Sequence, residues 1–345
     1  MNTKKNFYNY SILHLINFDD VDRGGAQKIL HLLLKQNVGT LTLKDGFFIN
    51  KIVTLVIQYF FVFFRCFGYR PRCVFIHSRC YLPFVLIFKL FSIKVIFYTH
   101  AHYRKHAWLF RLFNCDHYLA VSEAVKMSLI KQAVDKNKIK VIYNPYIGAS
   151  KKYTIEDNIE YCNVFGSVGS LSSWKGFREG MKFLNQIFIE KKETVQYRII
   201  GEGSEKQSLT TLGEALPQVN VELKGFHSSP FSLLADVPFI LIPSLEEGFG
   251  LVAIEAIYQN KIILYSDVPA LREVCGNDPL SFSFDINSFT TFETAYTKAI
   301  EIYHNQKVSN YSDKRQEYIV TKYSQDSFYK NHNQALQDFG LEKIY

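Results

Sequence analysis

Two glutamates, Glu247 and Glu255, are the residues in this 345-residue chain best placed to do chemistry. Glu247 lies in a loop with glycines, and Glu255 lies in the apolar stretch after it. The pattern predicts a buried strand over residues 240–242, a tight loop, and a helix over residues 251–258. A helix that follows such a loop directs its first N–H groups at the loop, which favours an anion, above all a phosphate.

Glu255 is unusual because its predicted helix is otherwise nearly all apolar. A buried carboxylate needs hydrogen-bond donors, and the hydroxyl groups of a ligand would supply them. The alternative is a solvated acidic loop followed by a core helix in which the protein itself satisfies Glu255. The spacing alone fits both interpretations, and the motifs described below favour a ligand.

The segment between the two glutamates contains four residues that would face this ligand: Gly248, Phe249, Gly250 and Leu251. With Glu247 and Glu255 it resembles the donor signature of retaining glycosyltransferases of family 4. The resemblance implies that Glu247 contacts the transferred sugar, that the loop N–H groups hold sugar and diphosphate, and that Glu255 binds the ribose hydroxyls. It also implies an α/β chain with the GT-B fold, in which two doubly wound, Rossmann-like parallel-sheet domains face each other across a cleft.

A pair of glycines near the N-terminus fits the same family. Gly24 and Gly25 follow an apolar stretch over residues 10–17 and precede a predicted helix over residues 26–35. The family has a Gly-Gly loop in this place, which implies that Gly25 faces the donor diphosphate and Gly24 the acceptor side.

His100 follows a predicted strand over residues 94–99, and His102 comes two residues later. Doubly wound sheets place their sites beyond the carboxyl ends of their strands. His100 matches a strand-end histidine that faces the donor sugar in the family, so we expect a catalytic role for it and an acceptor-side place for His102. The alternative for either histidine is a polar residue that caps backbone groups.

The C-terminal half repeats the alternation of strands and glycine loops. Lys175 matches a family lysine on the donor diphosphate, whereas Ser170 stands where the family has an arginine. Either Arg178 or Arg23 compensates for that charge, or the donor is bound more weakly. Two further positions match the nucleotide side of the family's donor site: Gly203 and Phe226.

The charge of the chain is divided unevenly. Residues 1–150 hold 21 Lys and Arg against 7 Asp and Glu, whereas residues 151–345 hold 19 against 25. No nucleic-acid motif accompanies the basic half, and its cations lie among apolar runs, so an anionic membrane surface is the expected partner. The most apolar run, residues 52–64, is too short to span a bilayer, which leaves a buried helix or a segment at the bilayer interface.

Cysteine and metal patterns point to a reduced compartment without a metal site. The six cysteines form neither a C-x-x-C motif nor a zinc-like cluster, and the N-terminus has no signal-peptide pattern. Asp20 and Asp22 spell D-x-D, but two aspartates before a Gly-Gly turn are commonly solvated or capping. We therefore expect a cytoplasmic protein at the inner face of the membrane, with no cofactor and no metal.

These observations predict an N-terminal acceptor-binding domain over residues 1–148, a nucleotide-sugar-binding domain over 149–323, and a C-terminal helix over 324–345 that crosses back. The expected activity is retaining, metal-independent transfer of a hexose or N-acetylhexosamine from a UDP-sugar to a lipid-linked oligosaccharide or other glycan of the cell surface. A sugar-nucleotide epimerase with the same fold and a non-catalytic glycosyltransferase-like subunit are the alternatives.

Overall fold

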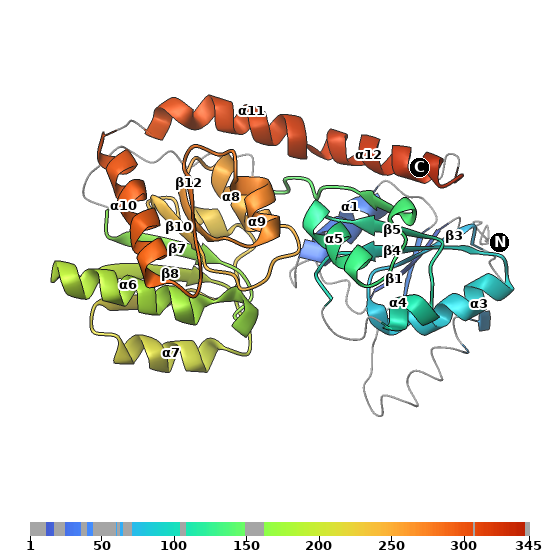
Figure 1. Cartoon of the computed structure of the whole chain (residues 1–345), viewed down its shortest axis with the longest axis horizontal. Helices are drawn as coiled ribbons and strands as arrows, with labels where there is room; N and C mark the ends of the chain where they lie inside the picture. Colours follow the sequence, from blue (N-terminus) through green and yellow to red (C-terminus); the bar gives the residue numbers. More distant parts are fainter. Residues whose placement is uncertain are drawn as a thin grey trace, which may run out of the picture. The chain divides into compact units, whose positions relative to one another are not determined.

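The structure is a computed structural model that describes residues 12–16, 25–35, 40–43, 60, 63–64, 71–103, 108–148, 162–305 and 308–341. Its contacts divide the chain into two compact units (Figure 1). Unit 1 consists of Met1–Asn144 together with Phe328–Tyr345, and unit 2 is Pro145–Ser327.

Unit 1 is built on a parallel sheet with the strand order β2-β1-β3-β4-β5-β6. Its strands are β1 (Ile12–Leu15), β2 (Thr40–Leu43), β3 (Cys73–Ile76), β4 (Lys94–Thr99), β5 (His117–Ala120) and β6 (Ile139–Val141). Its helices are α1 (Gly25–Lys35), α3 (Val85–Leu90), α4 (Trp108–Leu112), α5 (Glu123–Lys131) and α12 (Gln325–Asp338), of which α12 begins at the boundary with unit 2. The side chains of β1, β3, β4 and β5 are largely buried on both faces, as expected where helices cover a parallel sheet from both sides.

Unit 2 holds a second parallel sheet, with the strand order β12-β11-β10-β7-β8-β9. Its strands are β7 (Val164–Val168), β8 (Val195–Ile200), β9 (Val219–Leu223), β10 (Phe239–Ile242), β11 (Ile262–Ser266) and β12 (Ser281–Phe284). Its helices are α6 (Phe177–Lys191), α7 (Lys206–Ala215), α8 (Leu251–Tyr258), α9 (Pro269–Cys275), α10 (Phe289–Asn305) and α11 (Ser312–Tyr323). The predicted strand, loop and helix around the glutamates are therefore confirmed.

Each sheet reverses its direction of winding once. In unit 2, β7, β8 and β9 follow one another toward one edge, whereas β10, β11 and β12 lead to the other. The reversal falls between β7 and β10, and the corresponding reversal in unit 1 falls between β1 and β3. Ligands of doubly wound sheets bind outside the carboxyl ends of the strands at such a switch point.

The core of unit 2 shows how the sheet is held. Aromatic rings of β7, β10 and α10 stack on one face, with Phe165 and Phe239 at 5.1 Å between ring centroids. α6 contributes Met181 and Leu184 to the same buried cluster. At the start of β11, Arg315 of α11 forms a buried ion pair with Asp278 at 2.7 Å and donates to the carbonyl of Lys261 at 2.8 Å. The guanidinium thus satisfies groups that burial would otherwise penalise.

The helical segment between β3 and β4 has two parts. Residues Arg79–Phe84 form a 3₁₀ helix, and the α-helix proper is Val85–Leu90. Pro83 lies inside the 3₁₀ part and lacks the N–H that an α-helical bond there would need. Most of the apolar run at 52–64 lies outside the described residues, as does the Asp20–Asp22 pair.

No helix among the described residues combines the length and apolar character needed to cross a membrane. In the same residues, no group of three or more His, Cys, Asp or Glu is arranged to hold a metal ion.

Candidate active site

Three loops of unit 2 meet around the switch point of its sheet. They follow β7, β8 and β10, the three central neighbours in the strand order. The loop after β7 ends in a 3₁₀ turn, Ser173–Lys175, and the loop after β10 contains Glu247. The N–H of Leu245 donates to the carbonyl of Trp174 at 2.8 Å, so backbone hydrogen bonding joins the two loops.

Lys175 and Glu247 form an ion pair inside this group of loops. Their side chains are 17% and 12% exposed, so water screens the pair only in part. Ser244 donates a second hydrogen bond to Oε1 of Glu247 at 3.0 Å. The sequence predicts both charged residues to face the donor separately, and the structure brings them into direct contact.

Gly176 makes the close approach of the two loops possible. Its φ of 64° lies in the left-handed region, and a Cβ there would lie 1.8 Å from the carbonyl oxygen of Pro243. Any side chain would push the loop after β7 away from the loop after β10. The position of Lys175 beside Glu247 therefore depends on a glycine at position 176.

The helix α8 begins directly at the loop that carries Glu247. Gly250 precedes it with a φ of 99°, and Leu251 is its first residue. The first N–H groups of an α-helix have no intrahelical partner and carry partial positive charge. The ring of Phe249 is buried and packs edge-on against Tyr323 at 5.7 Å, which anchors the loop.

The turn after β8 packs against the loop after β7. The N–H of Leu171 donates to the carbonyl of Glu202 at 2.9 Å, and a Cβ on Gly203 would lie 2.3 Å from the carbonyl oxygen of Leu171. Phe226 follows β9 and is 48% exposed, so its ring is free of the core and open to a planar ligand. Both predicted nucleotide-side residues thus lie beyond the carboxyl ends of neighbouring strands.

Glu255 lies one turn into α8 and is buried, with 8% of its surface exposed. Tyr146 lies nearby and stacks on Tyr258 at 4.2 Å between ring centroids. Burial first, and then the neighbouring Tyr258 and Glu255, raise the pKa of the Tyr146 phenol. The phenol therefore keeps its proton and stays a hydrogen-bond donor at neutral pH.

If the site binds UDP, as the resemblance implies, replacing Glu255 with glutamine is expected to weaken UDP binding by about 1–3 kcal/mol, the range for a hydrogen bond to a charged group. The substitution keeps the shape of the side chain and removes the charge that would accept the ribose hydroxyls. Calorimetric titration with UDP measures the loss, and Glu214→Gln on the exposed side of α7 is the control. UDP affinity equal to wild type would remove Glu255 from the binding site.

In unit 1, the glycine loop and the strand end lie at the corresponding edge of the sheet. Gly25 is the first residue of α1, whereas Gly24 lies outside the described residues. His100 follows β4 directly and His102 is half-buried two residues later. The strand end predicted for His100 is confirmed.

The ring of His100 is fixed by two aromatic neighbours. It stacks on Tyr98 at 4.6 Å between centroids, and its Nε2 lies 2.9 Å from Nδ1 of His77. Burial lowers the pKa of His100 to about 3, so the ring is neutral above that pH. A neutral imidazole offers one donor and one acceptor, which suits a sugar hydroxyl better than a phosphate.

Sequence reasoning missed three residues around these sites: Ser244, Tyr146 and His77. Ser244 had a usable signal, because it comes two residues after the carboxyl end of β10. His77 had the same signal at the end of β3. Tyr146 had none, since its place beside α8 results from the path of the chain after Pro145.

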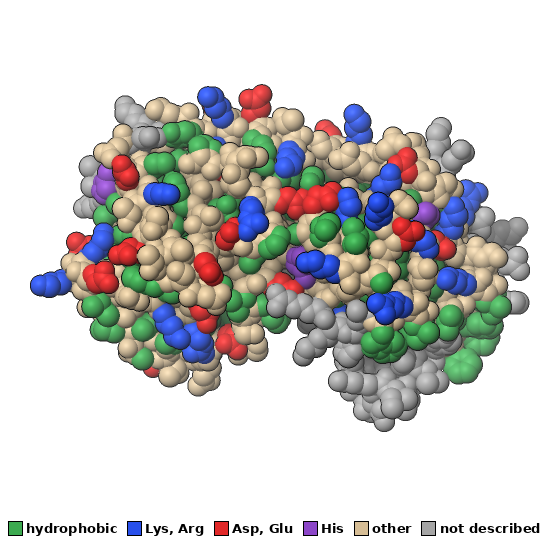
Figure 2. Space-filling view, viewed as in Figure 1, with side chains coloured by type: hydrophobic (Ala, Val, Ile, Leu, Met, Phe, Trp, Pro, Cys, Tyr) green, Lys and Arg blue, Asp and Glu red, His purple; other side chains and the backbone are tan. Residues whose placement is uncertain are grey.

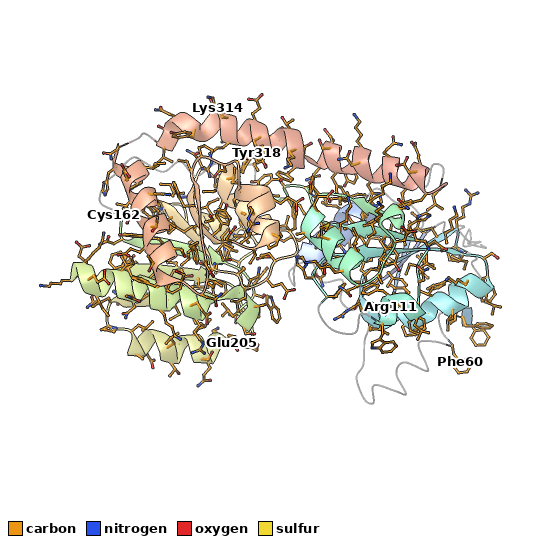
Figure 3. All side chains as sticks on the ribbon, in the orientation of Figure 1. Phe60, Arg111, Cys162, Glu205, Lys314 and Tyr318 are labelled. Atoms are coloured by element: carbon orange, nitrogen blue, oxygen red, sulfur yellow. The ribbon has the colours of Figure 1, made fainter. Side chains whose placement is uncertain are left out.

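Arg178 and Arg23 are the two cations that could compensate for the arginine missing at Ser170. Arg178 lies 3.9 Å from Glu205, a residue at the start of α7 that is labelled in Figure 3. Its guanidinium is 40% exposed, and Arg23 lies outside the described residues. Arg178 is thus the one of the two that lies in the described residues, and the carboxylate of Glu205 partly neutralises its charge.

Comparison with known proteins places this geometry in a defined class. The model of group 1 glycosyl transferases matches residues 154–316, and that of glycosyltransferase family 4 matches residues 37–146. A solved structure of Anabaena Alr3699/HepE in complex with UDP-glucose superposes with a TM-score of 0.74 over 95% of this chain and 99% of that chain, at 17% identity. The two parallel-sheet units are therefore those of a GT-B glycosyltransferase fold.

Two curated relatives narrow the family. The O-antigen biosynthesis glycosyltransferase WclY of Escherichia coli is 26% identical over 197 residues, which are 56% of this chain and 52% of that protein. The O-antigen chain mannosyltransferase RfbU of Salmonella typhimurium is 31% identical over 178 residues, which are 48% and 46%. The chain is thus similar to family 4-like GT-B glycosyltransferases of the surface-polysaccharide type, the class that the motifs predicted. It spans about half the length of the curated relatives that it matches.

Proposed function

We propose that the protein transfers a sugar from a UDP-sugar to a lipid-linked glycan of the cell surface, with retention at the anomeric carbon. The observation that carries the proposal is the sheltered Lys175–Glu247 pair at the switch point of unit 2, next to the first turn of α8. A cation and free helix N–H groups suit a diphosphate, and a carboxylate suits sugar hydroxyls. The UDP-glucose bound to the HepE neighbour and the O-antigen relatives support the donor and acceptor classes.

The chemistry depends on stabilising the leaving group. The bond between the anomeric carbon and the diphosphate oxygen breaks, and UDP leaves with the negative charge that develops. Lys175 and the N-termini of α8 and α1 would offset this charge, so that the reaction proceeds without a divalent cation. Glu247 and His100 would hold the sugar while the acceptor hydroxyl attacks from the face that UDP leaves, and the departing diphosphate oxygen takes the hydroxyl proton.

The resting ion pair has a consequence for the donor. An entering diphosphate must share the Lys175 ammonium with Glu247, since the two side chains are already in contact. Movement of the ammonium toward phosphate releases the Glu247 carboxylate for the hydroxyls of the sugar. Diphosphate binding and sugar positioning are thereby coupled through one charge.

A donor panel tests the proposed function. UDP-sugars are incubated with the protein, with and without a lipid-linked acceptor, and both UDP and sugar products are followed. The proposal expects acceptor-dependent release of UDP and an α- or β-linkage that matches the donor. Release of a changed free sugar without acceptor would indicate an epimerase instead, and absence of turnover with all donors would indicate a non-catalytic subunit.

We also propose that unit 1 lies on the inner face of the cytoplasmic membrane. Six large apolar side chains in or near α3 and α4 are exposed: Phe60, Phe64, Leu86, Leu90, Trp108 and Leu112. Hydrophobic side chains gather beside these two helices in Figure 2, and Figure 3 places Phe60 and Arg111 on the same side of unit 1. Lys89 and Arg111 add positive charge within α3 and α4.

The membrane proposal expects the protein to adsorb to vesicles that contain anionic lipid, with a contribution of about 1 kcal/mol from each engaged cation. Cosedimentation at low salt measures adsorption, and high salt should release the protein. The double substitution Leu90→Ser and Arg111→Glu should weaken adsorption, whereas Lys298→Glu on the exposed side of α10 should not. Equal adsorption of all variants would place the contact elsewhere.

A further inference from the structure

Three histidines of unit 1, the buried His14 and His77 and the half-buried His100, form a continuous chain of hydrogen bonds. Nδ1 of His14 lies 2.9 Å from Nε2 of His77, and Nδ1 of His77 lies 2.9 Å from Nε2 of His100. Successive rings are stacked with centroids 5.2 Å apart in both pairs. His77 and His100 directly follow the carboxyl ends of β3 and β4, whereas His14 lies within β1.

The parallel register explains why the rings meet. His14 of β1 is level with Phe75 of β3, and His77 comes two residues later on the same face. Ile76 is level with Phe97 of β4, so His77 is level with Tyr98, and His100 again comes two residues later. Each ring is therefore one step nearer to the carboxyl edge of the sheet than the ring before it.

The protonation state of this chain is restricted by burial. Burial lowers the pKa of His14 to about 3 and that of His100 to about 3, and burial with the neighbouring imidazoles lowers the pKa of His77. All three rings are thus neutral at pH 7, and each carries a single N–H. Each of the two ring-to-ring bonds uses one proton, so the third must lie on an outer nitrogen.

The two possible positions of the third proton fix all three rings. If Nδ1 of His100 carries it, then all three rings are protonated on Nδ1. If Nε2 of His14 carries it, then all three are protonated on Nε2. A mixed arrangement would place two lone pairs or two protons in one ring-to-ring contact.

The surroundings of His14, at the inner end of the chain, favour protonation of all three rings on Nδ1. Neither Nε2 of His14 nor Nδ1 of His100 has a hydrogen-bond partner among the described residues. A buried N–H without an acceptor is rarer in proteins than an unsatisfied acceptor, and His14 lies within the sheet, where no ligand reaches it. Nδ1 of His100 is buried as well, but His100 follows β4 at the carboxyl edge of the sheet, where a bound sugar would bring an oxygen to this N–H.

We propose that His77, supported by His14, is a positioning residue that holds His100 in the Nδ1–H tautomer and so makes its outer nitrogen a donor to a sugar hydroxyl. The inference rests on the proposed sugar transfer for its purpose, but the tautomer itself is independent of any substrate. His14 donates to Nε2 of His77, which leaves His77 its proton on Nδ1 for Nε2 of His100.

Nitrogen NMR of the full-length protein with ¹⁵N-labelled histidine tests the tautomer at pH 7. The proposal expects His14, His77 and His100 all to be protonated on Nδ1. Protonation of His100 on Nε2, or a mixture of tautomers, would overturn it. This measurement decides the matter even where a variant fails to fold.

Two substitutions of His77 separate positioning from packing. His77→Asn places an amide N–H where Nδ1 was and should keep the His100 tautomer and most of the turnover. His77→Phe fills the space without a donor and should lower turnover by on the order of tenfold to a hundredfold, with UDP affinity within about twofold of wild type. His332→Phe is the control, because the ring of His332 packs on Phe75 at 5.9 Å but takes no part in the two bonds.

The outcomes distinguish the inference from the proposed function. Equal loss of turnover in His77→Asn and His77→Phe would mean that His77 only packs, and the inference would fail. An unchanged His100 tautomer in His77→Phe would also show that His77 does not set the tautomer, and the inference would fail. The protein could show the expected tautomers and yet turn over no nucleotide sugar. That result would support the inference about the histidines and refute only the proposed function.

Discussion

Replacing His100 with alanine is expected to lower turnover by roughly tenfold to a thousandfold, because it removes a hydrogen bond to the sugar that strengthens as the anomeric centre flattens. Such a contact acts in the transition state, so the loss should appear in kcat more than in KM. UDP affinity should change little, since His100 would contact the sugar rather than the nucleotide. Because burial lowers the pKa of His100 to about 3, the His100-dependent part of turnover should be constant between pH 5 and pH 8.

His102→Ala is the matched control for this prediction, as it removes a half-buried histidine two residues further along the same loop. Melting temperature, UDP affinity and steady-state kinetics are measured for both variants. A fall in melting temperature with normal turnover per folded molecule would show that His100 only stabilises the strand end. Loss of turnover confined to His102→Ala would mean that the loop presents the later histidine to the sugar.

The second large effect concerns the diphosphate. Lys175→Ala should weaken UDP binding by roughly tenfold to a hundredfold, the range for hydrogen bonds to charged groups. Binding of uridine, which has no phosphate, should be nearly unchanged. The substitution also leaves Glu247 without its cation in a sheltered place, so a carboxylate would then repel the diphosphate and add to the loss.

Two further variants test whether the loss of UDP binding in Lys175→Ala comes from the Lys175–Glu247 pair. Glu247→Gln removes the competitor for the Lys175 ammonium, so UDP should bind as tightly as to wild type or more tightly while turnover falls. Lys206→Ala removes an exposed lysine that pairs with Glu202 on the surface, and it should alter neither quantity. Equal losses for uridine and UDP in Lys175→Ala would contradict a role at the diphosphate.

The sequence predicts the elements of the donor side well because local signals determine them. The apolar run and the glycine before it place α8 at Leu251–Tyr258, as expected. The strand β4 likewise has the expected bounds of Lys94–Thr99. Both rely on runs of apolar residues that end at a turn, which is the information that a single sequence carries.

Contacts between distant residues could not be predicted in the same way. The Lys175–Glu247 pair joins residues 72 positions apart, and it depends on the close approach of two loops at Gly176. His14 lies in an apolar strand and gave no sign of a partner 63 positions later. Such pairs follow from strand order and register, which the pattern of apolar residues leaves open.

The discontinuity of unit 1 affects how the protein is made. Unit 2 is one continuous segment, whereas unit 1 includes Phe328–Tyr345, and the buried side chains His332, Ala335 and Leu336 of α12 come from that segment. Lys94 donates to the carbonyl of Phe339 at 2.7 Å, and the ring of Phe339 stacks on His117 at 3.8 Å.

A ribosome that adds about 5–20 residues per second therefore releases unit 2 complete while the sheet of unit 1 still lacks this covering. During that interval the apolar face of β3 and β4 is open to chaperones and to other nascent chains. Unit 1, although it is synthesised first, is expected to finish folding last.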